Sequence, residues 1–494
     1  MAKFYITTAI PYVNSRPHLG HALEFVQTDV IARYHRQKGE EVFLLSGSDE
    51  NALKNVQAAQ IAGIPVQNFI DENAKSFVDL AGKLGIQVDV FQKGSSKDHH
   101  ASSQKFWELC RKAGDIYKKA YEGLYCVGCE AFYTTDELNE NQECAEHPGK
   151  KLEKISEENY FFKLSKYQDK LISLLEKDEL RVIPATRKNE VLSFLKQPLQ
   201  DISISRSNER AKNWGVQVPG DDSQRIYVWF DALNIYQSGI GFGLDDEKYK
   251  KWWPADVHVI GKGIVRFHGI YWIAFLLSAG LALPKKIFVH GYITVGGQKM
   301  SKTIGNVVDP FPLVETYGAD AVRYFLLREI PATEDGDFTK EKFQERYNSD
   351  LASGLGNLVA RILSLADRSA NDKIPILDSR RGGQIPNKIQ NPKLKELCQE
   401  IRTKTDVALE NFQFSEALIA IWELVHWCDT YIEEKRPWSF DPVQDKEQQK
   451  QVIGDLLFVI GKLAGFLAPF LPETSEKILQ RLRGEKQEIL FPRK

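Results

Sequence analysis

Hydrophobic and polar positions follow two different periods along the first fifty residues. Lys3–Ile10 (KFYITTAI) is rich in β-branched and aromatic residues and predicts a strand. After a loop that contains Pro11 and Pro17, apolar residues recur with helical spacing, and Gly39 is a suitable end for that helix. A second strand is predicted at Val42–Gly47. Strands that alternate with helices of this length indicate a parallel sheet with crossover helices.

The polar segments that follow these strands are candidate ligand sites. In open parallel sheets ligands bind beyond the carboxyl ends of the strands, and Pro17–His21 and Ser48–Asn51 lie at two such ends. Further strand signals are found at Arg225–Asp231 (RIYVWFD), Val257–Gly261 and Ile287–Tyr292. The predicted fold class is therefore α/β.

Two other parts of the chain have different patterns. Between about residues 116 and 225, short strands, polar residues and most of the clustered cysteines replace the alternation, as expected of an inserted module. From about residue 340 the pattern is helical, with long apolar helices predicted at Phe412–Cys428 and Val452–Phe470. A stretch at 378–392 that is rich in Gly, Pro and Asn is expected to be a loop.

The composition of the 494 residues is that of a globular chain, with 43% hydrophobic and 27% charged residues. Lys+Arg number 65 and Asp+Glu 67, so no global basic field indicates a nucleic-acid partner, and no DNA partner is expected. No apolar run approaches the ~20 residues that cross a bilayer, and no secretory leader is recognised at the N-terminus. We therefore expect a cytoplasmic protein with no membrane partner. Six cysteines in a chain of this length do not indicate a disulfide framework.

The first candidate motif is H-x-G-H, formed by His18, Gly20 and His21 at the start of the predicted helix. Helix N-termini attract anions through their free N–H groups and dipole, and two histidines add donors there. Gly20 leaves room for a base or a ribose. Taken alone, the motif is better explained by two surface histidines in a loop.

The second motif is K-M-S-K-T, which contains Lys299, Ser301, Lys302 and Thr303 and follows Gly296 and Gly297. Its lysines suit a polyphosphate whose negative charge grows in a transition state. A solvated basic turn is the alternative for this motif alone. The presence of both motifs in this order on one α/β chain is a far more specific signal than either motif alone. No G-x-G-x-x-G or P-loop pattern indicates another nucleotide site.

The cysteine spacing predicts a metal site. Cys126-x2-Cys129 and Cys144-x2-His147 are two half-sites fourteen residues apart. Three thiolates and one imidazole suit a tetrahedral, structural Zn²⁺. Scattered free thiols are the alternative, which is the interpretation we favour for Cys110, Cys398 and Cys428.

On these motifs the chain resembles the class I aminoacyl-tRNA synthetases, and among them the methionine-specific branch. The resemblance covers essentially the whole chain and includes four more segments: Ala9–Asn14 (AIPYVN), Glu157–Leu164 (EENYFFKL), Ser203–Arg206 (SISR) and Tyr227–Ala232 (YVWFDA). It implies a Rossmann-like parallel-sheet domain, an inserted connective domain with a zinc knuckle, and a C-terminal α-helical bundle. The implied divisions are 1–115 and 226–292 for the catalytic halves, 116–225 for the connective domain, 293–350 for the K-M-S-K-T loop and stem-contact region, and 351–494 for the anticodon-binding helices.

The resemblance also implies site residues. His18, Gly20, His21, Lys299, Ser301 and Lys302 would bind ATP, and the two histidines and two lysines would be catalytic. The methionine site would consist of Ile10, Tyr12, Asp49, Trp229, Ala232, Tyr236, Ile264, His268 and Trp272, with Asp49 on the amino group. The anticodon readers would be Asn357, Arg361, Pro437 and Trp438. Without the resemblance, the tryptophans would be interpreted as core or loop residues and Asn357 as a surface residue.

The implied reaction has two steps. Methionine attacks the α-phosphate of ATP to give methionyl-adenylate and pyrophosphate, and the methionyl group then passes to the 3′ end of tRNA(Met). Mg²⁺ would accompany ATP, and one structural Zn²⁺ would be bound per chain. Because the helical region runs to Lys494, we expect a monomer.

Four residues at three places depart from the family pattern. Asn51-Ala52 replaces a frequent His-Gly, Gly263 replaces a frequent Asp, and Thr303 replaces a frequent Ser. None removes the His pair, the Lys pair or Asp49, so activity is expected. One alternative is a class I synthetase for another apolar amino acid, but the chain is too short to contain the editing insertion of such enzymes. The other is an inactive paralogue that binds RNA. In such a paralogue we would expect the two signature motifs to be degraded.

Overall fold

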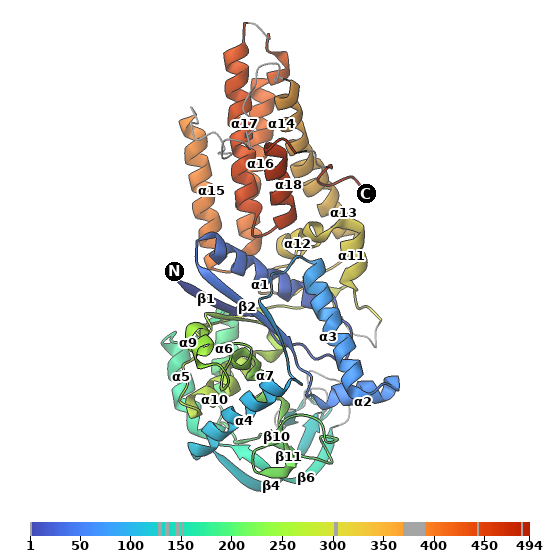
Figure 1. The fold of residues 1–494 in the computed structure, drawn as a ribbon, viewed down its shortest axis with the longest axis vertical. Helices are drawn as coiled ribbons and strands as arrows, with labels where there is room; N and C mark the ends of the chain where they lie inside the picture. Colours follow the sequence, from blue (N-terminus) through green and yellow to red (C-terminus); the bar gives the residue numbers. More distant parts are fainter. Residues whose placement is uncertain are drawn as a thin grey trace. The chain divides into compact units, whose positions relative to one another are not determined.

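The structure is a computed structural model. It describes residues 2–126, 131–133, 138–144, 149, 152–300, 305–368, 391–441, 444–485 and 488–494. The chain forms two compact units (Figure 1). The first contains Met1–Thr28, His35–Gly82 and Ile86–His290, and the second contains Asp29–Tyr34, Lys83–Gly85 and Gly291–Lys494.

In the described part of the first unit, six strands form one sheet in the order β3-β2-β1-β12-β13-β7. Their bounds are β1 (Lys3–Thr7), β2 (Glu41–Ser48), β3 (Val90–Lys93), β7 (Arg181–Ile183), β12 (Val257–Gly261) and β13 (Lys286–His290). Every neighbouring pair is parallel. All the carboxyl ends therefore share one edge, and the loops after β1, β2 and β12 start there. This confirms the predicted α/β parallel sheet.

The helices of this unit connect and cover those strands. Their bounds are α1 (Leu19–Gln37), α2 (Leu53–Ala62), α3 (Val66–Lys83), α4 (Lys97–Lys112), α5 (Gln168–Glu176), α6 (Ala185–Leu195), α7 (Val228–Leu233), α8 (Ile235–Ser238), α9 (Asp246–Trp252) and α10 (Ile273–Ser278). The first helix begins directly after His18, as the sequence predicts. It is followed by Gly39 in the left-handed region, with a φ of 83° that glycine adopts without steric cost.

The stretch expected as an insertion contains antiparallel strands. β4 (Ile116–Cys126) pairs with β5 (Ala131–Tyr133) and with β6 (Glu153–Phe162), which also pairs with β8 (Ile202–Ser203). A second group consists of β9 (Ser205–Ser207), β10 (Gln217–Val218) and β11 (Asp221–Ile226). The same stretch also supplies β7, which pairs with β13 as the edge strand of the main sheet.

The strand predicted at Arg225–Asp231 is wrong for most of its length. Only its first two residues continue β11, and from Val228 the chain is the helix α7. A short apolar run does not distinguish a buried strand from a buried helix by periodicity. The helical turn places Asp231 where three side chains donate to or pair with it, as described below.

The second unit is mainly helical. Its strands are β14 (Ile293–Val295), β15 (Gln298–Lys299) and β16 (Gly336–Asp337), and its helices are α11 (Pro310–Tyr317), α12 (Ala319–Arg328), α13 (Lys340–Arg346), a π-helix (Tyr347–Gly356), α14 (Asn357–Arg368), α15 (Pro392–Glu410), α16 (Phe414–Lys435), α17 (Lys446–Leu467) and α18 (Pro472–Leu482). The two long apolar helices predicted from the sequence are α16 and α17. Most of the loop predicted at 378–392 lies outside the described residues. In the portions of the chain that are described, no helix has the length and apolar character needed to cross a membrane.

The second unit contains a buried ion pair between Arg323 and Asp29, both with fully buried side chains. Arg323 Nη1 lies 2.8 Å from Asp29 Oδ2, and the guanidinium also donates to the backbone oxygens of Leu84, Pro469 and Phe470 at 2.7–3.2 Å. Burial of a charge is costly unless every donor has a partner. Here the one guanidinium satisfies carbonyl groups from two chain segments.

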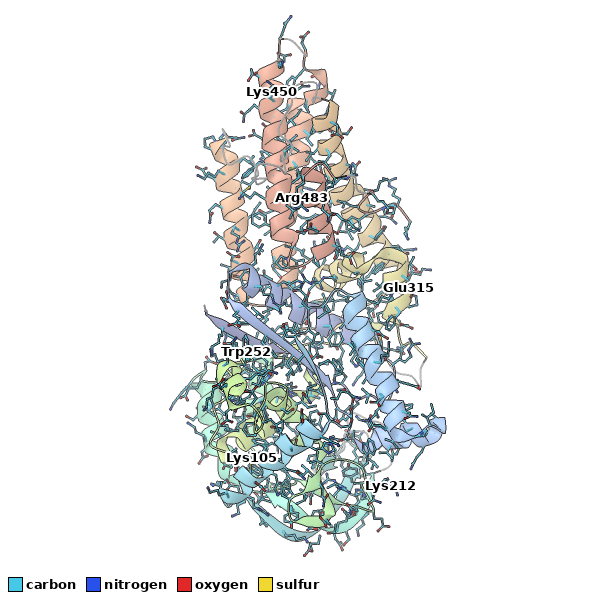
Figure 2. All side chains as sticks on the ribbon, in the orientation of Figure 1. Lys105, Lys212, Trp252, Glu315, Lys450 and Arg483 are labelled. Carbon is cyan, nitrogen blue, oxygen red and sulfur yellow. The ribbon has the colours of Figure 1, made fainter. Side chains whose placement is uncertain are left out.

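We expect Arg323→Met to lower the free energy of unfolding of the second unit by about 3–5 kcal/mol, because three buried carbonyls and Asp29 lose a donor. Urea unfolding monitored by circular dichroism would measure the loss. Arg483→Met is the matched control: Arg483, at the end of α18 (Figure 2), forms surface ion pairs with Glu476 and Glu485, and its loss should cost less than about 1 kcal/mol. Equal losses in both variants would contradict the role given to Arg323.

Candidate active site

The two histidines of H-x-G-H lie at the first turn of α1, and their rings are 3.9 Å apart between centroids. The backbone N–H of Gly20 donates to His18 Nδ1 and that of His18 donates to His21 Nδ1, both at 3.1 Å. In a neutral imidazole with an accepting Nδ1, the proton is on Nε2. Both rings are therefore set to donate through Nε2.

The charge state of His21 supports this arrangement. Burial lowers the pKa of His21 well below its usual range, and the neighbouring His18 and His290 add to the effect. The ring is therefore neutral at neutral pH and acts as a hydrogen-bond donor rather than as a cation.

A carboxylate that the sequence analysis missed joins two strand ends beside these histidines. Glu24 Oε1 accepts from the backbone N–H of Ala9 at 2.9 Å, and Glu24 Oε2 lies 3.0 Å from His290 Nε2. Glu24 thus links the loop after β1 to the end of β13. Its place four residues after Gly20, on the same helix face, is a weak signal that gives no indication of a partner in β13.

A buried Tyr236–His268 pair lies at the centre of the expected methionine site. Tyr236 Oη lies 2.7 Å from His268 Nε2, and His268 Nδ1 lies 2.9 Å from the backbone oxygen of Ile264. Burial lowers the pKa of His268 to about 4. The neutral ring donates from Nδ1 to the carbonyl, so its Nε2 accepts from the Tyr236 hydroxyl.

Aromatic rings surround this pair. Trp229 packs edge-on against Tyr12 (6.3 Å between centroids) and His268 (6.4 Å), and it stacks on Phe267 at 3.8 Å. Trp272 packs edge-on against Tyr236 at 6.1 Å. The structure therefore brings together residues predicted from three separate segments of the sequence, and the π-helix Phe267–Trp272 supplies two of them.

The other expected members of the site lie on neighbouring elements. Asp49 is buried and pairs with Tyr12 in a parallel bridge, where its backbone N–H donates to the oxygen of Pro11 at 2.9 Å. Ile10 packs half-buried against the core of this unit, and Ala232 is buried on α7.

The departure at Asn51 has a structural explanation. Its amide donates to Asp231 Oδ2 at 2.6 Å and to the backbone oxygen of Gly94 at 2.8 Å. Asp231 Oδ1 also accepts from Ser103 at 2.7 Å and lies 2.8 Å from His99 Nε2. Burial alone would raise the pKa of Asp231, but His99 and these donors hold it below its usual range. The amide thus serves as one donor to a buried carboxylate.

Lys299 of the second motif belongs to the second unit, in the hairpin of β14 and β15. Gly296 and Gly297 form its turn with φ of 61° and 74°, which two-residue hairpin turns of this type require. Asp337 holds the turn by accepting from the backbone N–H of Gly297 at 2.8 Å. Lys299 is exposed, with its Nζ 4.5 Å from the ring centroid of Tyr292. Ser301, Lys302 and Thr303 lie outside the described residues.

Half of the predicted zinc ligands can be located. Cys126 ends β4 and Cys144 lies beyond the paired strand β5, and both are buried. Cys144 Sγ lies 3.4 Å from Tyr133 Oη. Cys129 and His147 lie outside the described residues, and within the described ones no group of three or more potential metal ligands is found.

The expected anticodon residues lie in the second unit. Asn357 and Arg361 are one turn apart on α14, with Asn357 exposed and Arg361 half-buried. The guanidinium carbon of Arg361 lies 5.3 Å from the ring centroid of Trp438, and its Nη2 lies 2.5 Å from Glu433. Pro437 is buried, whereas Trp438 is 51% exposed. A large aromatic ring so exposed is unusual in a structural role.

Two family models match the chain. The one described as tRNA synthetases class I (M) matches residues 4–363, and the one described as anticodon-binding domain of tRNA ligase matches residues 394–493. Among curated relatives, the methionine–tRNA ligase of Thermotoga maritima is 41% identical over 488 residues, covering 98% of this chain and 76% of the relative. That of Rhizobium meliloti is 40% identical over 481 residues, covering 97% and 91%.

Solved structures are similar over the whole chain. Mycobacterium tuberculosis methionyl-tRNA synthetase in complex with methionyl-adenylate aligns with a TM-score of 0.90 and 36% identity, covering 100% of this chain and 98% of that chain. The apo form of the same enzyme aligns with a TM-score of 0.84 and 33% identity, covering the same shares.

The pKa of His268 predicts a pH dependence of stability. In the unfolded chain the imidazole of His268 has its ordinary pKa of ~6.5. In the folded protein its pKa is about 4, so between these two values the unfolded chain binds a proton that the folded protein does not. The free energy of unfolding should therefore fall as the pH falls from ~6.5 to ~4, with about 3 kcal/mol of the decrease due to His268. His268→Gln should show a shallower decrease over that window and no difference in slope above pH 7. Parallel curves from pH 7.5 to 4 would contradict a buried, neutral His268.

Proposed function

The chain belongs to the methionine–tRNA ligases, a family of class I tRNA synthetases, and from this premise we propose how its residues divide the reaction. It is an aminoacyl-tRNA ligase: it activates methionine with ATP to methionyl-adenylate and pyrophosphate and transfers methionine to the 3′ end of tRNA. The residue roles below are inferred from the geometry of this chain.

The methionine side chain is bound between aromatic rings. Trp229, Tyr12 and Trp272 offer apolar faces and edges, against which a flexible thioether packs favourably. The neutral Tyr236–His268 pair adds polarity without a charge. The aromatic rings around the Tyr236–His268 pair are the observation that best supports the assignment of a methionine site. Asp49, buried beside Tyr12, binds the amino group. Ile10, Ala232 and Ile264 complete the walls.

Adenylate formation needs alignment and charge stabilisation but no covalent residue, because the methionine carboxylate is itself the nucleophile. His18 and His21 donate hydrogen bonds from Nε2 to the phosphate oxygens as negative charge develops on them. Gly20 in the same turn allows close approach of the nucleotide. Lys299, Lys302 and Ser301 stabilise the departing pyrophosphate. Mg²⁺ bound with ATP would supply further charge neutralisation.

The residue pattern fits a structural zinc ion. Thiolates need a metal or a cationic neighbour to remain charged when buried. Cys126, at the end of β4, and Cys144, beyond β5, are buried and carry the correct donor atoms. With Cys129 and His147 they would hold one Zn²⁺, which would fix the β4–β5 hairpin rather than take part in the chemistry.

The helical second unit is proposed to recognise the anticodon of tRNA(Met). The exposed Trp438 ring offers a stacking surface, and Asn357 and Arg361 offer hydrogen-bond donors on a neighbouring helix. Pro437 fixes the backbone before the ring. The proposed divisions are those given from the sequence, with 351–494 as the anticodon-binding part. We propose a monomer that acts in the cytoplasm.

The first experiment is amino-acid-dependent ATP–pyrophosphate exchange with methionine, leucine, isoleucine, valine and cysteine. Exchange is expected with methionine alone. Lys302→Ala should lower the exchange rate at least ~100-fold, since the positive charge that stabilises the departing pyrophosphate is lost, while methionine binding by calorimetry stays within ~2-fold. Exchange with a branched amino acid would overturn the pocket assignment. Equal losses of exchange and binding would overturn the role of Lys302.

A second experiment separates the two units by function. Trp438→Ala should lower the kcat/KM for tRNA aminoacylation ~10-fold or more, as one stacked base is worth about 1–3 kcal/mol, and leave exchange unchanged. Trp438→Phe, which keeps a stacking ring, should restore most of the loss. If exchange and aminoacylation fall together, Trp438 has a structural role instead.

A further inference from the structure

A buried polar cluster joins helix α4 to the two short helices of the proposed methionine site. Of these, α7 carries Trp229 and Ala232, and α8 carries Tyr236. The two helices have six and four residues, far fewer than the roughly 12–15 at which a helix becomes stable by itself. Their positions, and with them the shape of the site, are therefore fixed by contacts with other elements.

His99 of α4 contacts both short helices through its two ring nitrogens. Its Nε2 lies 2.8 Å from Asp231 Oδ1 on α7, and its Nδ1 lies 2.8 Å from Ser238 Oγ on α8. The imidazole is fully buried and the carboxylate almost fully, so solvent does not compete for these bonds. One side chain thus links the helix that carries Trp229 to the helix that carries Tyr236.

The carboxylate of Asp231 is the stronger of the two anchors. Ser103, one turn after His99 on α4, donates to the same Oδ1 at 2.7 Å. Burial alone would raise the pKa of Asp231, but His99 and the surrounding donors hold it below its usual range, so the group is ionised and His99 Nε2 donates to it. Hydrogen bonds to a charged group are about twice as strong as neutral ones. Helix α4 therefore holds α7 mainly at Asp231.

The direction of the side chains connects this anchor to the methionine site. Trp229 and Ala232 are three residues apart and share one face of α7, whereas Asp231 projects from another side of the helix. If Asp231 is held less firmly, α7 is free to rotate about its axis. Such a rotation would move the Trp229 ring away from its edge-on contacts with Tyr12 and His268.

Apolar packing holds α4 against α7 independently of the polar cluster. The ring centroid of Phe230 on α7 lies 5.1 Å from that of Phe106 and 5.5 Å from that of Trp107, and all three side chains are fully buried. These contacts remain when His99 is replaced. Its loss should therefore alter where α7 lies rather than whether the unit folds.

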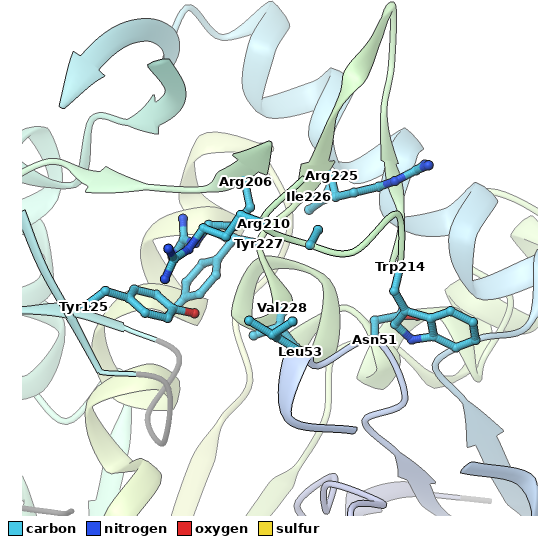
Figure 3. Close-up of a pocket in the computed structure, with 11 residues that line it drawn as sticks. Asn51, Leu53, Tyr125, Arg206, Arg210, Trp214, Arg225, Ile226, Tyr227 and Val228 are labelled. Carbon is cyan, nitrogen blue, oxygen red and sulfur yellow. The ribbon is translucent and has the colours of Figure 1, made fainter. Parts of the chain in front are cut away.

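Asn51 also donates to Asp231 but has other contacts as well. Its amide donates to the backbone oxygen of Gly94, and its side chain lines a pocket together with Val228 (Figure 3). A substitution of Asn51 would therefore change several contacts at once. His99 does not line that pocket, and both of its ring nitrogens are used within the cluster. This makes His99 the residue whose substitution tests the cluster alone.

We propose that His99 is a positioning residue for methionine: it holds α7 through Asp231 and α8 through Ser238 in the arrangement that binds the substrate side chain. The inference rests on the proposed function and adds a residue that lies outside those assigned to methionine and ATP. Loss of His99 lowers the fraction of molecules in which Trp229 and Tyr236 are correctly placed. The affinity for methionine falls in proportion to that fraction.

The first test is His99→Asn. Its short amide reaches the position of Nδ1, so it keeps a bond to Ser238 but none to Asp231. The Kd for methionine by calorimetry and the KM for methionine in exchange should both rise about tenfold. The kcat at saturating methionine and the KM for ATP should stay within ~2-fold. A merely structural role would instead lower the active fraction, and with it kcat, without a change in either KM.

His99→Gln is the conservative variant. Its longer amide reaches the position of Nε2 and keeps a donor to Asp231, so the KM for methionine should rise only about threefold. Ser238→Ala, which removes a single hydroxyl, should raise that KM by about the same factor in the parent protein. It should add nothing in His99→Gln, because the bond to Ser238 is already absent there.

His35→Gln is the matched control. His35 lies at the end of α1, where its Nδ1 is 3.0 Å from a carboxylate oxygen of Glu40, and its loss should leave both KM values within ~2-fold of the parent protein. An effect on the KM for methionine equal to that of His99→Asn would overturn the proposal.

Three further outcomes would also overturn it. A KM for ATP that rises as much as the KM for methionine would show that His99 acts on the whole active site. If His99→Gln is as damaging as His99→Asn, the volume of the ring matters and the donor to Asp231 does not. An unchanged KM for methionine in His99→Asn and Ser238→Ala, with an active parent protein, would refute this inference alone. A parent protein that neither binds methionine nor catalyses exchange with it would instead refute the proposed function, and this inference with it.

Discussion

The parallel pairing of β1 with β12 is the constraint on which the site depends. These strands lie at the centre of the sheet, in register from Ile6 with Val257 to Thr7 with His258, and β2 and β13 continue the parallel order on either side. Because parallel strands end at one edge, the loops after β1 and β2 start close to the loop after β12, although β12 ends more than 200 residues further along the chain. The hydrogen bonds of Glu24 to Ala9 and His290 join two of these strand ends directly.

Burial determines the chemistry at that edge. His21, His258 and His268 all have pKa values lowered by burial, so they act as neutral donors and acceptors. His258 accepts from Trp272 Nε1 at 3.4 Å and therefore donates to Thr7 Oγ1 at 2.8 Å. A neutral substrate side chain and the negative charge that develops on a phosphate both suit a site whose polarity comes from oriented hydrogen bonds. Lys299, whose charge is stable in water, lies instead in the exposed β14–β15 hairpin.

The sequence predicted those elements whose signal is local. The strand at Lys3, the helix that begins after His18 and the glycine that follows it were all recognisable from periodicity and capping. The family resemblance predicted the aromatic network around Trp229 and His268, whose rings the structure places in contact. The part Val228–Asp231 of α7 was predicted as a strand because a short run of buried residues has no period that distinguishes a strand from a helix. Glu24 and His290 were missed since their pairing joins residues 266 apart, and no local pattern contains such information.

Asn51 illustrates how a residue that departs from a family pattern can still satisfy the hydrogen bonds required at its position. Its requirement is local: one donor for Asp231 and one for the carbonyl of Gly94, and a primary amide carries two N–H groups. Asp231 in turn lies on α7 between Trp229 and Ala232, so its buried charge fixes the helix that carries two residues of the proposed methionine site. A residue at position 51 with fewer donors would leave a buried carboxylate or carbonyl unsatisfied, which costs about 1–3 kcal/mol. The constraint at this position is therefore the number of donors, and asparagine meets it without an imidazole.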